Sequence, residues 1–352
     1  MSKLLSQGGF GCVYYPGITC NGETDKDKKY VTKLQRRDFN ADNEIHIGNL
    51  ISTIKNYKNF FIPVIKSCDI DLRRIDSSIV SDCQVVSQSG EVNYLLMTLN
   101  YVKNISLENT IVTSSSKEIK KRSFAQLLSM YTYLLNSIKL LYEKNIIHFD
   151  LKVDNLLFGI KLGTPLVIDF GISIPKDKLN KDSMKKYFYA FVPEYYVWPL
   201  EVHVINYLLH STQSTLTDYD INLISSRFGE SNDALLFFSK SFKERYLLSC
   251  KYQLKKYIGL DRDKVIDQLL SYNHTWDNYS LSIMFITIYI KIFKQGMYFN
   301  KMFVFFIELL VINMSPDPNL RLNIDDSLYE YNKCFYIESD TNNYVNLINH
   351  LR

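Results

Sequence analysis

The chain has 352 residues, of which 46% are hydrophobic and 22% are charged, as in an ordinary globular protein. Its net charge of +4 is weak for this length, so we expect no nucleic-acid partner. Two apolar runs, Leu281–Ile290 and Met302–Ile312, are far shorter than the ~20 residues that a membrane-spanning helix needs. We therefore expect buried helices there and no membrane span.

Strand patterns dominate the first hundred residues. Leu5–Tyr15 is typical of a strand, a glycine turn and a second strand, and Tyr30–Leu34 predicts a third. Asp42–Ile54 has the apolar spacing of a helix. Residues 60–100 predict two or three further strands, with a polar insert at roughly 67–91 that has no clear periodicity.

Helical patterns dominate the rest of the chain. Phe124–Tyr142 places its leucines on one stripe with three- and four-residue spacing. Trp198–Thr275 is mostly helical in pattern, Tyr279–Asn313 forms a further helical block, and a last helix is expected from about Ile324. Strands followed by helices predict the α+β class.

Residues 148–155 read His-Phe-Asp-Leu-Lys-Val-Asp-Asn, and residues 167–171 read Val-Ile-Asp-Phe-Gly. These segments bring two carboxylates, a lysine and a carboxamide close together in the sequence. Phosphoryl transfer from a nucleotide needs such a set: a carboxylate to accept the proton of an attacking hydroxyl, a carboxylate and an amide oxygen to hold magnesium, and a lysine to neutralise the moving phosphoryl group. Positioning and electrostatics supply most of the catalysis in such reactions.

The two segments resemble the catalytic loop, His-Arg-Asp-Leu-Lys-x-x-Asn, and the Asp-Phe-Gly turn of the eukaryotic-type protein kinases. The resemblance implies that Asp150 is the catalytic base, that Lys152 contacts the γ-phosphate, and that Asn155 and Asp169 bind Mg²⁺. His148 would be structural, packing under the Asp-Phe-Gly turn.

The resemblance also implies a bilobal kinase-like fold with a small β-rich N-lobe and a large helical C-lobe. We expect the N-lobe at residues 1–99, the C-lobe at 100–335 with a helical insert at about 202–275, and a C-terminal tail at 336–352. The insert would serve as extra packing or as a docking surface.

Further residues match the nucleotide-binding half of the family. Lys33 would hold the α- and β-phosphates and be oriented by Glu44, with Asp42 as the second choice; a surface lysine near a surface acid is the alternative. For Leu99 at the back of the adenine pocket and Asn100 beside it, ordinary strand-end packing explains the residues equally well. The glycine loop, in which a plain hairpin is the alternative, comprises Gly8, Gly9, Gly11 and Val13.

Two distant matches favour protein kinases over small-molecule kinases. Val192-Pro193-Glu194 resembles the family's Ala-Pro-Glu, and residues 317–321 resemble its Asp-Pro-x-x-Arg, so the resemblance predicts a buried pair between Glu194 and Arg321. Asp277 matches an aspartate that tethers the backbone of the catalytic loop.

Two positions depart from the family. Phe149 replaces the arginine that grips an activation-loop phosphate, which leads us to hypothesise activity without phosphorylation of that loop, for example at Ser183. Ser6 replaces the first loop glycine. The stretch from Tyr196 to Glu201 resembles protein kinases of large DNA viruses.

Taken together, these patterns predict an ATP- and Mg²⁺-dependent serine/threonine protein kinase, because Asp-Leu-Lys-x-x-Asn is the serine/threonine pattern of the family. An inactive pseudokinase scaffold and a small-molecule kinase are the alternatives. We expect a monomer that binds ATP and a protein substrate. Six scattered cysteines without a Cys-x-x-Cys pair predict free thiols. No signal peptide precedes the glycine loop, so we expect a cytoplasmic location, in the host cytoplasm or virion if the source is viral.

Overall fold

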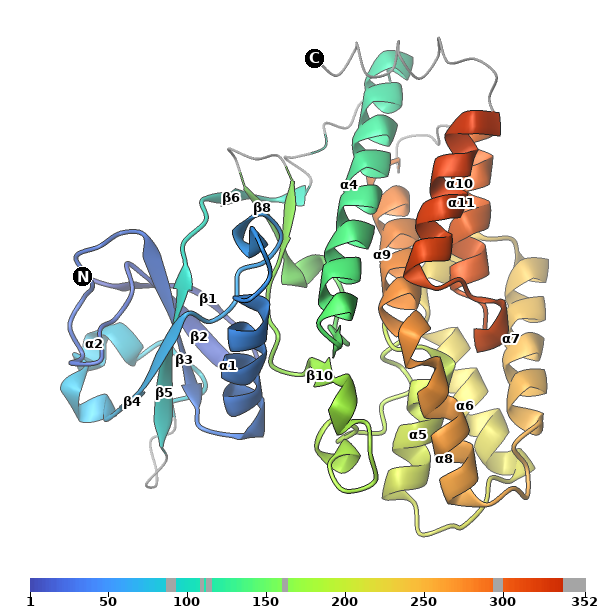
Figure 1. Ribbon diagram of the computed structural model, residues 1–352, viewed down its shortest axis with the longest axis horizontal. Helices are drawn as coiled ribbons and strands as arrows, with labels where there is room; N and C mark the ends of the chain where they lie inside the picture. The colour runs from blue at the N-terminus through green and yellow to red at the C-terminus, as the bar shows by residue number, and fades with distance from the viewer. Residues whose placement is uncertain (87–92, 108–110, 112–115, 160–163, 294–299, 338–352) are drawn as a thin grey trace. The chain divides into compact units, whose positions relative to one another are not determined.

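In the computed structural model the chain divides into two compact units, and each is described by itself. The first unit comprises Met1–Ile105 and Leu156–Ser173, and the second comprises Ser106–Asn155 and Ile174–Arg352. Figure 1 shows strands in the first and long helices in the second. The structure describes residues 1–86, 93–107, 111, 116–159, 164–293 and 300–337. The expected tail at 336–352 lies outside them beyond its first two positions.

A five-stranded antiparallel sheet forms the centre of the first unit, in the order β1-β2-β3-β5-β4. Its strands are β1 (Lys3–Gln7), β2 (Gly11–Tyr15), β3 (Tyr30–Arg36), β4 (Lys66–Ile70) and β5 (Tyr94–Asn100). Successive side chains of a strand point to opposite faces. In β3, Leu34 therefore packs in one apolar cluster, whereas Lys33 shares the other face with Val31.

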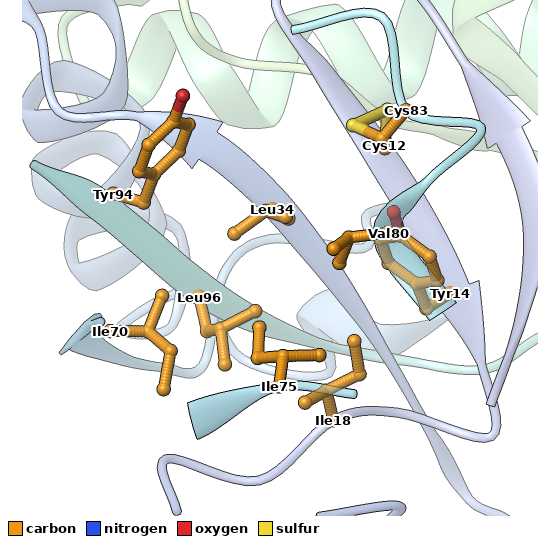
Figure 2. Close-up of a cluster of buried hydrophobic side chains, with 10 residues drawn as sticks. All are labelled: Cys12, Tyr14, Ile18, Leu34, Ile70, Ile75, Val80, Cys83, Tyr94 and Leu96. Carbon is orange, nitrogen blue, oxygen red and sulfur yellow. A yellow bond between two sulfur atoms is a disulfide. The ribbon is translucent and has the colours of Figure 1, made fainter. Parts of the chain in front are cut away.

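Leu34 belongs to a buried cluster on the first of these faces, and Figure 2 shows its ten side chains: Cys12, Tyr14, Ile18, Leu34, Ile70, Ile75, Val80, Cys83, Tyr94 and Leu96. Ile75 and Val80 come from the polar insert between β4 and β5, where α2 (Ser77–Val80) is a single helical turn. The insert thus closes this face of the sheet.

The prediction of free thiols is wrong for four of the six cysteines. Cys12 is disulfide-bonded to Cys83, and Cys20 is bonded to Cys68. The partners are 71 and 48 positions apart in sequence, so only the folding of the insert onto the sheet brings their Cα atoms to 5.9 and 6.1 Å. Sequence spacing carries no trace of such pairs. Cys250 is a buried free thiol.

Helix α1 (Phe39–Ile51) packs beside the sheet. The side chain of Asp38 caps its N-terminus by accepting a hydrogen bond from the Ala41 amide at 2.8 Å. Glu44 and Gly48 are one turn apart and both buried. A Cβ atom on Gly48 would lie 2.6 Å from the Val64 carbonyl oxygen, so only glycine allows this close approach. The approach directs Glu44 inward.

A smaller antiparallel sheet of β6 (Asn104–Ile105), β8 (Leu156–Gly159) and β9 (Pro165–Val167) completes the first unit. In the second unit, β7 (Ile146–Ile147) pairs with β10 (Ile174–Pro175). The segments with the kinase-like motifs therefore follow β7 and β9 directly, and short paired strands fix where each begins.

Long helices form the core of the second unit, as the apolar spacing predicts: α4 (Lys117–Glu143), α9 (Trp276–Ile292), α10 (Lys301–Asn313) and α11 (Ile324–Ile337). The Tyr131 ring of α4 meets Phe285, Phe306 and Tyr331 from the other three. The stretch expected to be helical at 202–275 contains α5 (Leu200–His210), α6 (Asp218–Glu230), α7 (Lys240–Lys255) and α8 (Arg262–Leu270). Within the described part of the chain, no helix has the length and apolar character needed to cross a membrane.

Candidate active site

Three charged side chains of the first unit meet at Lys33. The Lys33 Nζ atom lies 2.7 Å from Glu44 Oε2 and 3.3 Å from Asp169 Oδ1. The Lys33 and Glu44 side chains are 11% and 2% exposed, so the alternative of a surface pair does not hold. The Asp169 side chain is 38% exposed. The Lys33 ammonium group thus contacts one buried and one partly exposed carboxyl group.

Burial and charge act in opposite directions on this cluster. Burial disfavours the charged form of Lys33, but the carboxylates of Glu44 and Asp169 outweigh it and raise the pKa of the lysine. Burial raises the pKa of Glu44, and Lys33 opposes that rise. Lys33 is therefore an ammonium ion at neutral pH.

The turn after β9 presents Asp169. Its backbone has a φ of 62°, in the left-handed region that few non-glycine residues adopt. The Phe170 ring is buried and meets Phe61 edge-on at 6.2 Å. Asn43 of α1 donates to the carbonyl oxygens of Gly171 and Ser173, at 2.9 and 2.8 Å. The sequence analysis missed Asn43, whose only signal is its place beside Glu44.

The glycine loop connects β1 and β2. The Gly8 amide donates to the Gly11 carbonyl at 2.9 Å, and added Cβ atoms at Gly8 and Gly9 would meet nothing within 4 Å. At Gly11 a Cβ atom would lie 2.8 Å from the Leu34 carbonyl, so this glycine is already required by strand packing. Val13 pairs with Lys33 in the sheet register.

The residues expected near adenine lie at the end of β5. Leu99 is buried in the apolar cluster on the Lys33 face of the sheet, and Val13 packs against the same cluster. Asn100 pairs with Tyr30 in the sheet register. The Tyr101 amide donates to the Lys29 carbonyl at 2.8 Å, so strand-end packing already uses this group.

In the second unit, polar contacts converge on Asp150. Asp150 Oδ2 lies 2.9 Å from Lys152 Nζ and accepts a hydrogen bond from Asn155 Nδ2 at 2.9 Å. The same amide nitrogen donates to the Asp150 carbonyl oxygen at 2.8 Å. The structure thus brings together the three site residues predicted in this loop, with the carboxylate oriented by its neighbours.

Asp277, in the first turn of α9, holds the backbone of this loop. Its carboxylate accepts hydrogen bonds from the amides of His148 at 2.7 Å and Phe149 at 2.9 Å, which is the tether that the resemblance predicted. Phe149 has a φ of 69° and its ring stacks on Trp198 at 4.9 Å. Trp198 Nε1 also donates to the Phe149 carbonyl at 2.7 Å. Aromatic packing therefore replaces the arginine that the family has at this position.

Tyr195 is a second residue that the sequence analysis missed. Its hydroxyl donates a hydrogen bond to Asp150 Oδ1 and accepts one from Lys152 Nζ at 3.0 Å. Burial, and secondly the Asp150 carboxylate, raise the pKa of Tyr195, so the phenol stays protonated. The contact spans 45 residues, so no local pattern could reveal it.

The predicted buried pair of Glu194 with Arg321 is wrong. Arg321 pairs with Glu201, and these side chains are 1% and 3% exposed. Glu194 pairs instead with Arg227 of α6, near the surface. Both glutamates follow a proline within two positions, but only Glu201 lies in the first turn of a helix and is buried there. The burial of the glutamate, rather than the Val-Pro-Glu motif, therefore determines which of the two pairs with Arg321.

Each unit offers an oxygen atom of a kind that suits magnesium. Mg²⁺ prefers carboxylate and other oxygen ligands and keeps several waters, so it needs few protein ligands. Asp169 offers a partly exposed carboxylate, and Asn155 uses its nitrogen toward Asp150, which leaves its amide oxygen as the atom for a cation. Within the described residues, no group of three or more His, Cys, Asp or Glu side chains could hold a metal.

A sequence model of the protein kinase domain matches residues 2–197, more than half of the chain. The chain belongs to the protein kinase domain family. The matched range of this kinase domain includes every predicted site residue, from Gly8 to Asp169. It ends before α5 begins.

Curated relatives of this kinase domain are distant. It is 29% identical over 171 residues to the mitogen-activated protein kinase kinase kinase MST11 of Pyricularia oryzae, covering 48% of this chain and 16% of the fungal protein. It is 28% identical over 107 residues to the serine/threonine-protein kinase PknD of Chlamydia trachomatis serovar D, covering 28% of this chain and 11% of PknD. The chain therefore matches only a small part of the length of these relatives.

Proposed function

We propose that the chain is a serine/threonine protein kinase that transfers the γ-phosphoryl group of Mg-ATP to protein hydroxyls. The observation that carries the proposal is the contact of the buried Lys33 with both the buried Glu44 and the partly exposed Asp169. A lysine held as a cation beside a partly exposed carboxylate is suited to a nucleotide phosphate on one side and a metal ion on the other.

Each group then has a role. Mg-ATP, when bound, supplies the phosphoryl group and an ADP leaving group. Lys33 binds the α- and β-phosphates, and Asp169 and Asn155 hold the metal. Asp150 orients the acceptor hydroxyl and takes its proton, and Lys152 neutralises charge on the moving phosphoryl group. The loop Gly8–Gly11 covers the phosphates, and the apolar cluster with Leu99 and Val13 receives the base.

The acceptor class rests on Lys152 in Asp-Leu-Lys-x-x-Asn and on the similarity to the serine/threonine-protein kinase PknD. An inactive scaffold is a weaker candidate, because it needs neither an oriented Asp150 nor the Lys33 cluster. A small-molecule kinase is also weaker, because the chain has the buried glutamate–arginine pair, although Glu201 rather than Glu194 supplies it.

We further propose that the enzyme acts as a monomer in a cytoplasm, or in a virion if its source is a virus. The resemblance of residues 196–201 to viral kinases supports that source. The two disulfides weigh against a cytosolic location, because such bonds are more typical of an oxidising environment.

Labelling with γ-labelled Mg-ATP tests the proposed function. The purified chain should phosphorylate casein on serine or threonine, and mixed metabolites should stay unlabelled. Asp169→Asn should lower the rate by at least about 10²–10³-fold. Asp177→Asn is the control, because Asp177 is an exposed aspartate in an ion pair with its neighbour Lys178. Labelled metabolites with unlabelled casein, or equal rates for wild type and Asp169→Asn, would overturn the proposal.

A further inference from the structure

Tyr195 has no role in the proposed chemistry, yet it touches both the proposed base, Asp150, and Lys152, which is assigned to the phosphoryl group. Its hydroxyl donates to Asp150 Oδ1 and accepts from Lys152 Nζ at 3.0 Å. Lys152 Nζ also lies 5.4 Å from the centre of the Tyr195 ring. A hydroxyl therefore already sits on the carboxylate that an incoming serine or threonine hydroxyl must reach.

The Asp150 carboxylate is fully engaged in this arrangement. Oδ1 takes the Tyr195 hydroxyl and Lys152, and Oδ2 takes Asn155 and Lys152. A carboxylate offers about four lone-pair sites, so a new hydroxyl must displace a donor. Lys152 and Asn155 are assigned to the phosphate and the metal. Tyr195 is the donor whose departure leaves both assignments intact.

Backbone hydrogen bonds and ring packing hold Tyr195 in place. Its amide donates to the Val192 carbonyl at 2.9 Å, and its own carbonyl accepts from the Trp198 amide at 3.1 Å. Its ring meets the Trp198 ring edge-on at 5.1 Å. The backbone can stay anchored while the side chain rotates, so opening requires the hydroxyl contacts and the ring contacts with Trp198 and Lys152 to break.

We propose that the Tyr195 hydroxyl occupies the acceptor position on Asp150, so that a substrate hydroxyl gains access to the base only by displacing it. The inference rests on the proposed function and names the device that controls its acceptor side. It follows that Tyr195 selects against weak acceptors such as water, which lack the binding contacts needed to compete with a phenol hydrogen-bonded to a carboxylate.

Tyr195→Phe tests the inference, because it removes the hydroxyl and keeps the ring on Trp198. With casein as acceptor and saturating Mg-ATP, kcat/KM should rise about tenfold, mostly through a lower KM for casein, since one charge-assisted hydrogen bond no longer has to break. Hydrolysis of ATP without casein should also rise. The matched control is Tyr196→Phe, which removes the next hydroxyl, bonded to Asp233 at 3.0 Å, and should change neither rate.

The outcomes separate the inference from the function beneath it. If wild type labels casein and Tyr195→Phe has an equal or lower kcat/KM, Tyr195 is a support for Asp150 and Lys152, and the inference is overturned while the function stands. If wild type and both variants melt normally but none transfers phosphate, the proposed function falls and the inference falls with it. A rise in Tyr195→Phe alone supports both.

Discussion

The two units contain buried ion pairs that differ in one respect. In the first unit, Lys33 and Glu44 are buried, but their third partner Asp169 is 38% exposed. In the second unit, Glu201 and Arg321 are 3% and 1% exposed, so both members are closed off. A pair with an exposed member can exchange that partner for a ligand. A fully enclosed pair can only stabilise the fold. The exposure of one member therefore distinguishes a candidate binding site from a structural ion pair.

Removing one member of the enclosed pair should have the largest effect on stability. Glu201→Gln leaves Arg321 buried without its counter-charge, which should lower the free energy of unfolding by about 3–5 kcal/mol. Chemical denaturation measures the change. Glu194→Gln breaks the surface pair with Arg227 and should cost less than about 1 kcal/mol. Similar losses in both variants would refute the distinction between the two pairs.

Removing the corresponding glutamate of the open cluster should affect activity more than stability. Glu44→Gln leaves Lys33 with Asp169 alone and misplaces its ammonium group, so casein phosphorylation should fall about 10²-fold. Initial rates at saturating Mg-ATP measure the effect, and melting curves check the fold. A variant as active as wild type would show that Glu44 does not orient the lysine.

His203, a buried ionisable residue of the second unit, makes the free energy of unfolding depend on pH. Burial lowers the pKa of His203 to about 3, against 6.5 in the unfolded chain. Between these values the unfolded state binds a proton that the folded state does not. As the pH falls below 6.5, the free energy of unfolding should therefore decrease by about 1.4 kcal/mol per pH unit because of this group. His203→Gln should flatten the slope, whereas the exposed His46→Gln should leave it unchanged. An unchanged slope in His203→Gln would contradict this assignment.

The smallest effect is expected at the activation segment. Phe149 is enclosed by Trp198 and Phe188 where the family has a phosphate-gripping arginine. The Ser183 hydroxyl bonds to the Lys178 carbonyl at 2.7 Å. Ser183→Ala should therefore keep its phosphorylation rate within about twofold of wild type. Loss of activity in a folded Ser183→Ala protein would revive control by loop phosphorylation.

Local sequence patterns predicted the features that depend on residues close together in the chain. The apolar stripe of α4 follows from side-chain periodicity, and the structure confirms this helix and the predicted strand β3. Asp150, Lys152 and Asn155 lie within six positions, so one turn of backbone suffices to gather them. The site roles themselves stay predictions.

The errors share a different cause, namely contacts between segments far apart in sequence. The Cys12–Cys83 bond depends on how the insert folds over the sheet. Arg321 pairs with Glu201, which is 120 positions away in sequence, because α5 buries that glutamate. Tyr195 reaches Asp150 through the path of the chain before α5. None of these contacts has a period or spacing that a single sequence could display.

In the proposed function, Asp169 of the first unit binds the metal–nucleotide and Asp150 of the second unit supplies the base. The most direct measurement is the rise in melting temperature that ATP produces, with and without Mg²⁺, in wild type, Asp150→Asn and Asp169→Asn. We predict that the extra rise due to Mg²⁺ persists in Asp150→Asn, which no longer phosphorylates casein, and disappears in Asp169→Asn. An undiminished magnesium effect in Asp169→Asn would contradict the proposed role of Asp169 as a metal ligand.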